Sequence, residues 1–128
     1  MYRYANVNPV GNTVEDCLVR AIAIVMEIPC EKAYIDLCNR GLLIYDMPNS
    51  AATLSVYLRE KGFKRHIISN DCPACFTIED FSREYPDGKY IVLTSNHAVP
   101  VIDGDYYDAI DSGNLIPQYY WKKERVKQ

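Results

Sequence analysis

The stretch NHAVPVIDGDYYDAIDSG, residues 96–113, decides the fold because it contains two alternating apolar runs around one turn. Alternation with a period of two residues is typical of β-strands. The dipeptide Asp103-Gly104 stands between the two runs, and an Asp-Gly pair in this position predicts a β-hairpin. The stretch therefore indicates two adjacent antiparallel strands, and the length of their loop determines which side chains share a face.

Two loop lengths are compatible with this hairpin. A two-residue loop, 103–104, would set His97 opposite Ile110. A three-residue loop, 103–105, would set His97 opposite Asp111 and turn Asp108 to the other face. The second register also gathers apolar residues on the face of His97, namely Val99, Val101, Tyr107 and Ala109. We therefore expect the three-residue loop, in which His97 and Asp111 are close enough to interact.

Outside this hairpin, helical patterns fill the first half of the chain and strand patterns fill the second. Apolar spacing, caps and stop signals predict helices over residues 16–27, 29–41 and 50–62. Further strands are expected at 63–69 and 89–95, with a short helix beginning at Thr77 between them. Helices followed by an antiparallel meander predict an α+β fold. A chain of 128 residues is expected to form one domain, 1–128.

Cys17 lies where the first helix is expected to begin. Thr13 and Asp16 form a possible capping box, or Asp16 caps the helix directly and makes Cys17 its first residue. The positive end of a helix stabilises a thiolate, and a nearby imidazolium does so further. A thiol, an imidazole and an orienting acid together form a known nucleophilic arrangement. The alternatives are that Cys17 is a small buried apolar residue and that His97 is a structural strand histidine.

The motifs DCLVRAIAIVM, residues 16–26, and HAVPVIDGDYYDAIDSG, residues 97–113, resemble the papain-like cysteine peptidases. The likeness is greatest to small bacterial and phage members and to the bacteriocin-leader peptidases. It implies a papain-like fold with N-terminal helices packed on a C-terminal antiparallel sheet. It also implies that Cys17 is the nucleophile, His97 the general base and acid, and Asp111 the orienting residue. The implied substrate is a peptide or protein.

The family also uses a Gln shortly before the cysteine as an oxyanion donor, and this chain has none there. Asn12 carries a similar amide and is the expected substitute, beside the backbone N–H of Cys17. This departure leaves a second hypothesis open. The chain would then be an inactive papain-like protein of phage or mobile-element type that sequesters a host factor or ligand.

Cys72 and Cys75 form a Cys-x-x-Cys pair, which has three interpretations. A zinc site needs four ligands, and Cys30 and Cys38 are too far apart on an expected helix to form a second pair. A redox motif normally opens a helix after a strand. We expect a structural or incidental pair, with zinc and redox roles as alternatives, and no metal or cofactor.

Composition limits the remaining classes. The net charge of −3 and the interleaved acids and bases argue against a nucleic-acid partner. The N-terminus lacks the apolar segment of a signal peptide, and no apolar run is long enough to span a membrane. We therefore expect a cytoplasmic protein with five reduced cysteines. His66 is expected to be structural, and Trp121 to pack the C-terminus onto the body.

Overall fold

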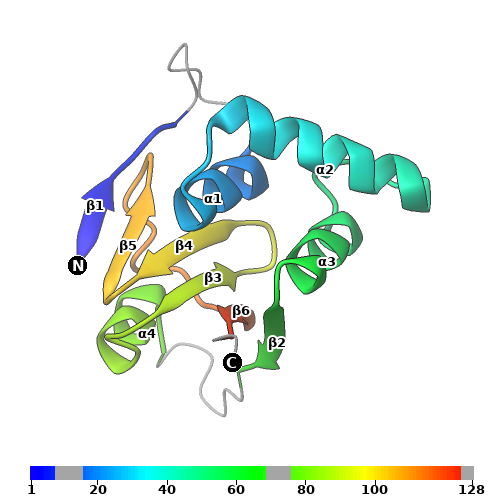
Figure 1. Cartoon of the computed structure of the whole chain (residues 1–128). Helices are drawn as coiled ribbons and strands as arrows, with labels where there is room; N and C mark the ends of the chain where they lie inside the picture. Colours follow the sequence, from blue (N-terminus) through cyan, green and yellow to red (C-terminus); the bar gives the residue numbers. More distant parts are fainter. Residues whose placement is uncertain (8–15, 69–75, 125–128) are drawn as a thin grey trace.

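The computed structural model describes residues 1–7, 16–68 and 76–124, and within them it has an α+β architecture (Figure 1). The four helices are α1 (Cys17–Met26), α2 (Cys30–Ile44), α3 (Ala51–Glu60) and α4 (Ile78–Glu84). The six strands are β1 (Tyr2–Tyr4), β2 (Phe63–Ile67), β3 (Lys89–Leu93), β4 (Ala98–Ile102), β5 (Asp105–Asp108) and β6 (Tyr119–Lys123). The predicted α+β class is thus confirmed.

The six strands form a single sheet in the order β1-β5-β4-β3-β6-β2. The expected meander is present, since β3, β4 and β5 pair as antiparallel neighbours. The expectation of a purely C-terminal, antiparallel sheet is wrong, because β1 from the N-terminus pairs with β5 in parallel. This edge strand was too short to give an alternating pattern of its own. The sheet is therefore mixed, and its two outer strands come from outside the meander.

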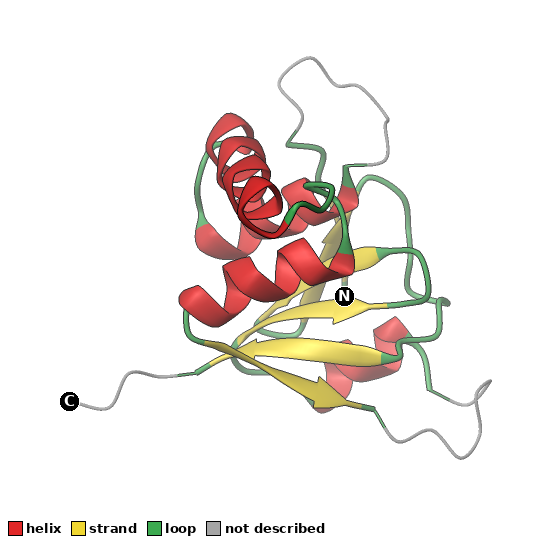
Figure 2. Cartoon of the chain, turned by 90° about the vertical axis from the view of Figure 1, so that its right-hand side faces the viewer, coloured by secondary structure: helices red, strands yellow, loops and turns green. Residues whose placement is uncertain are grey.

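Helices cover both faces of the sheet (Figures 1 and 2). Alternation along β3 separates two cores: Ile91 packs with residues of α1, α2 and α3, whereas Val92 packs with residues of α4. Trp121 on β6 belongs to the larger core and is 2% exposed. The prediction that Trp121 packs the C-terminus onto the body is confirmed, although a strand there was not foreseen. Helix α1 lies against β4 and β3, and this packing brings its first residue to the sheet.

The β4–β5 hairpin has the shorter of the two possible loops. Ile102 pairs with Asp105, so the prediction of a three-residue loop is wrong. The two loop residues, Asp103 and Gly104, adopt φ angles of 49° and 84°. Positive φ at both positions is the type I′ turn, whose twist matches that of the strands. Asp103 is held in this conformation by two bonds with Gly88, whose N–H donates to Oδ1 and whose carbonyl accepts from the Asp103 N–H.

Helix α1 begins where one prediction placed it, whereas α2 ends later than predicted. Asp16 occupies the N-cap position of α1 and Cys17 is the first helical residue, as one of the two alternatives had it. The expectation that α2 ends at Gly41 is wrong, since the helix continues to Ile44. Gly41 serves a different purpose: a Cβ there would lie 2.7 Å from the carbonyl oxygen of Asp46. No helix of the described ranges has both the length and the apolar character to cross a bilayer.

Candidate active site

Cys17 and His97 line the same cavity. The cavity has a volume of about 180 Å³ and lies where the starts of α1, α3 and β6 meet the β3–β4 turn. Other lining residues include Leu18, Asn49, Ala51, Leu93, Thr94 and Tyr119. The structure therefore brings together two side chains that the sequence places on distant segments. Both residues are partly exposed.

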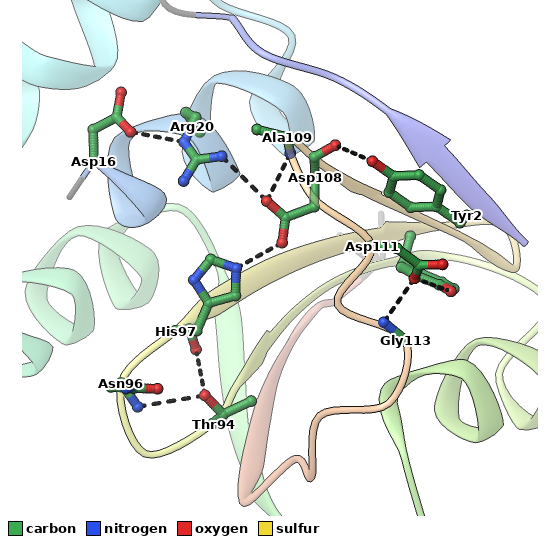
Figure 3. Close-up of polar contacts among 11 residues, drawn as sticks. Tyr2, Asp16, Arg20, Thr94, Asn96, His97, Asp108, Ala109, Asp111 and Gly113 are labelled. Carbon is green, nitrogen blue, oxygen red and sulfur yellow. Dashed lines mark hydrogen bonds and ion pairs between the residues drawn. The ribbon is translucent and has the colours of Figure 1, made fainter. Parts of the chain in front are cut away.

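A tight turn fixes the position of His97. Strands β3 and β4 are joined so that the N–H of Thr94 donates to the carbonyl oxygen of His97 at 2.8 Å. The hydroxyl of Thr94 also accepts from the N–H of Asn96 at 3.4 Å, inside the same turn (Figure 3). His97 thus stands at the first position after a two-residue loop, directly before β4. Its imidazole is anchored by the sheet rather than carried on a long loop.

The acid beside His97 is Asp108, not Asp111. Nε2 of His97 lies 2.6 Å from Oδ2 of Asp108 (Figure 3). Asp111 instead accepts hydrogen bonds from the Tyr106 hydroxyl at 2.9 Å and from the Gly113 N–H at 3.0 Å. The predicted pairing of His97 with Asp111 is therefore wrong. It extended strand alternation as far as residue 111, whereas β5 ends at Asp108 and the chain then bends away.

Several backbone contacts hold Asp108 in place. Its carbonyl oxygen accepts from the N–H of Ala5 at 2.9 Å and from the hydroxyl of Tyr2 at 3.1 Å. Its carboxylate oxygen Oδ1 accepts from the N–H of Ala109 at 2.7 Å. The side chain is only 3% exposed, so water competes little for these bonds. The short strand β1 therefore helps to fix the residue that orients His97.

The protonation equilibria of this group follow from its contacts. The hydrogen bond to Asp108, together with one to Cys17, raises the pKa of His97 from 6.5 to about 9. Burial raises the pKa of the Cys17 thiol, but hydrogen bonds to His97 and to the Ala98 backbone, with nearby positive charge, outweigh it and lower that pKa overall. Burial likewise opposes ionisation of Asp108, yet its bond with His97 keeps the pKa of the carboxyl below its ordinary value. The pair is thus biased toward thiolate and imidazolium.

Arg20 is a residue of this region that the sequence analysis missed. Its Nε lies 2.7 Å from Oδ1 of Asp16, and its Nη1 lies 3.2 Å from Oδ1 of Asp108 (Figure 3). The signal was present in the spacing: on a helix, Arg20 is one turn after Cys17 and four residues after Asp16. Residues spaced in this way share one face of the helix, and Arg20 on that face reaches Asp108 at the end of β5.

Two further predictions concern residues whose structure is not described. Asn12, the expected oxyanion donor, lies outside the described residues, as do Cys72 and Cys75. Cys17, Cys30 and Cys38 are free thiols. Among the residues that the structure describes, no group of three or more His, Cys, Asp or Glu side chains could hold a metal ion. His66 lies on β2, where its ring stacks on Tyr120.

Comparisons of the chain with family models, curated proteins and solved structures found no match. Cys17, His97 and Asp108 form a continuous sequence of contacts that begins at a helix N-terminus and ends on a buried carboxylate.

Proposed function

We propose that the protein is a cysteine hydrolase of papain-like fold that cleaves an amide or ester bond in a peptide or protein substrate. Cys17 is the nucleophile, His97 the general base and acid, and Asp108 the residue that orients His97. The single observation that carries this proposal is the shared cavity in which Cys17 meets an imidazole already bound to a buried carboxylate. Such a thiol–imidazole–acid arrangement activates cysteine for acyl transfer.

The two ring nitrogens of His97 have different roles in this mechanism. Because Nε2 is bound to Asp108, Nδ1 is the nitrogen left to exchange a proton with the thiol. The Cys17 thiolate attacks the carbonyl carbon and forms a bond to it, and the tetrahedral oxyanion collapses as the amine or alcohol leaves. His97 gives its proton to that leaving group. Water then attacks the thioester, with His97 taking its proton, and the acid product leaves Cys17 free.

Developing negative charge on the carbonyl oxygen needs hydrogen-bond donors. The first N–H groups of a helix have no partner within the helix, and Cys17 is the first residue of α1. Its backbone N–H is therefore a suitable oxyanion donor. The amide of Asn12 stays our prediction for a second donor.

The proposed setting is the cytoplasm, where Cys17 would remain reduced. A protein that only binds a partner through the same cavity is the competing function. Binding does not require a reactive thiol, whereas hydrolysis does. The reactivity of Cys17 therefore separates the two functions without knowledge of the substrate.

The test is labelling of the intact, reduced protein with iodoacetamide at pH 6, followed by peptide mass spectrometry. Cys30 is an internal control, because burial raises the pKa of its thiol. We expect Cys17 to react at least about tenfold faster than Cys30 and Cys38, and His97→Gln to remove most of this difference. Equal labelling of the three thiols in the wild-type protein would refute the proposed hydrolase.

A further inference from the structure

We infer that Arg20 is a positioning residue of this site: it holds the carboxylate of Asp108 in the orientation that receives His97. This inference rests on the proposed function, because it assigns a role within the same group of residues. Arg20 itself does not line the cavity that holds the thiol. It would act through Asp108.

The two oxygens of Asp108 contact different groups: Oδ1 accepts from the Ala109 N–H at 2.7 Å and also faces Arg20, whereas Oδ2 faces His97. Oδ1 lies 3.2 Å from Nη1 of Arg20, and Oδ2 lies 2.6 Å from Nε2 of His97. A carboxylate held at both oxygens cannot rotate about its terminal bond without losing a charged contact. Figure 3 shows the guanidinium and the imidazole on different sides of this carboxylate. Arg20 is the charged partner that, together with the Ala109 N–H, holds Oδ1 and so fixes the direction in which Oδ2 points.

A second carboxylate holds Arg20 itself. Nε of Arg20 lies 2.7 Å from Oδ1 of Asp16, and both side chains are 13% exposed. Asp16 is the N-cap residue of α1, but its side chain makes no cap hydrogen bond. It contacts the guanidinium instead. The helix start therefore supplies an anchor for the arginine in place of an ordinary cap.

The geometry suits arginine better than lysine. A guanidinium is planar and presents several N–H donors in fixed directions, so it can engage two carboxylates at once. An ammonium is a compact charge on a flexible stem and does not fix the angle between two partners. Arg20 uses Nε for Asp16 and Nη1 for Asp108, and so ties α1 to β5. The helix that carries the thiol thereby also carries the group that holds the acid.

Charge supports the same role. Asp16, Arg20, Asp108, His97 and Cys17 alternate in sign when the thiol is ionised and the imidazole protonated. The positive charge of Arg20 contributes to lowering the pKa of Cys17. Removal of the guanidinium would leave two poorly hydrated carboxylates near each other, with only His97 to offset them. The nearby Cys30 thiol also interacts with the charges of Asp16 and Arg20.

The experiment compares Arg20→Gln and Arg20→Lys with a matched control, Arg40→Gln. Arg40 on α2 also contacts two carboxylates, at 2.8 Å from Glu60 and 3.9 Å from Asp36, and its side chain is 20% exposed. It does not line the cavity. The readout is the rate of iodoacetamide alkylation of Cys17 in the full chain from pH 4 to pH 10, which requires no substrate. Thermal unfolding is measured in parallel.

We expect Arg20→Gln to raise the pH at which the Cys17 alkylation rate increases by about 0.5–1 unit, which is a roughly 3–10-fold loss of rate at any pH below that rise. Arg20→Lys should recover at most part of this shift, and Arg40→Gln should keep the wild-type profile. An unchanged profile in Arg20→Gln, or an equal shift in Arg40→Gln, overturns the inference. If Arg20→Gln does not fold, Arg20→Lys decides: a shifted profile supports the role and an unchanged one overturns it.

The wild-type profile separates this inference from the proposed function. If the alkylation rate of wild-type Cys17 does not rise at a lower pH than that of Cys30, the hydrolase proposal fails. If the Cys17 rate does rise at lower pH but substitution of Arg20 does not move that rise, only the positioning role fails.

Discussion

Asp108 lies with its carboxylate 2.6 Å from Nε2 of His97, although its side chain is buried and its strand ends at that residue. The chain bends immediately after this residue, at 109–110. Asp111, three residues further along the chain, instead accepts hydrogen bonds from the Tyr106 hydroxyl and the Gly113 N–H. The two acids are close in sequence and similar in chemistry, so they offer a direct test of the site.

Asp108→Asn should lower the pKa of His97 from about 9 toward its ordinary value of 6.5. The hydrogen bond to the charged carboxylate is the main cause of the elevation, and asparagine keeps the shape of the side chain but not its charge. The measurement is an NMR titration of the His97 ring resonances.

Asp111→Asn is the matched control for this titration. It should leave the pKa of His97 within a few tenths of the wild-type value. It should reduce stability by about 1–2 kcal/mol, because Tyr106 and Gly113 lose a charged acceptor. A His97 titration that responds to Asp111→Asn rather than to Asp108→Asn would contradict the assignment.

The pH dependence of stability should differ between the wild type and Cys17→Ala. His97 has a raised pKa, so its stabilising contribution is complete below pH 6.5 and is lost as the pH rises to about 9. Cys17 has a lowered pKa, so its contribution is complete above its ordinary value near 9 and is lost as the pH falls through the lowered value. In the wild type the two trends oppose each other between these limits.

We therefore expect the free energy of unfolding of the wild type to change less with pH between pH 6.5 and pH 9 than that of Cys17→Ala. In Cys17→Ala the free energy of unfolding should fall with rising pH, by at most about 1.4 kcal/mol per pH unit. Urea unfolding at a series of pH values measures both curves. Parallel curves for the two proteins would show that Cys17 and His97 do not share a proton equilibrium.

Ala51→Trp should restrict access to the thiol. Ala51 is the exposed first residue of α3 and lines the cavity with Cys17. A large ring there fills space that a small reagent does not need. We expect alkylation by iodoacetamide to change less than about twofold, while a reagent with an aromatic group slows by about tenfold or more, equivalent to about 1.4 kcal/mol.

Ala52→Trp is the control for cavity access. Ala52 is also exposed on α3 but does not line the cavity. Both reagents should react with this variant as with the wild type. If the two tryptophan variants slow the bulky reagent equally, the described cavity is not its route to Cys17.

Gly41→Ala should destabilise the fold by about 1–2 kcal/mol, even though alanine favours helices. An added Cβ would lie 2.7 Å from the carbonyl oxygen of Asp46, which is backbone and cannot move aside easily. Asn39→Ala, at an exposed position of the same helix, should instead be neutral or slightly stabilising. Thermal unfolding of both variants checks this difference, and equal effects would contradict it.

The sequence predicted elements best where the local signal was strong. Thr77 forms the capping box of α4, and Ser50 caps α3 as its side chain accepts from the Thr53 N–H. Prediction failed where distant contacts decide the structure. Tyr2–Tyr4 and Tyr119–Lys123 become strands because they pair with β5 and with β3 and β2, which no local pattern announces. Gly41 was misread because a glycine can serve close packing as well as a helix end.

In the site, too, local signals were predicted correctly and contacts between distant segments were not. Cys17 and His97 stood out because each combined a reactive side chain with a recognisable local position. The choice between Asp108 and Asp111 depended on loop length and on the end of β5, both of which are set by three-dimensional pairing. Arg20 was missed because an i,i+4 ion pair on a helix is common, and only the fold places it beside Asp108.

The position of β6 also has a consequence for the order in which the protein is made. Strand β6 comes last in the chain but lies between β3 and β2, so the sheet is completed only after residues 119–123 have been synthesised. Contacts between distant segments form slowly, because their closure entropy must be overcome before they stabilise the chain. On the ribosome, Cys17 emerges long before His97 and Asp108. The growing chain therefore lacks the His97 and Ala98 contacts that lower the pKa of the Cys17 thiol until folding is nearly finished.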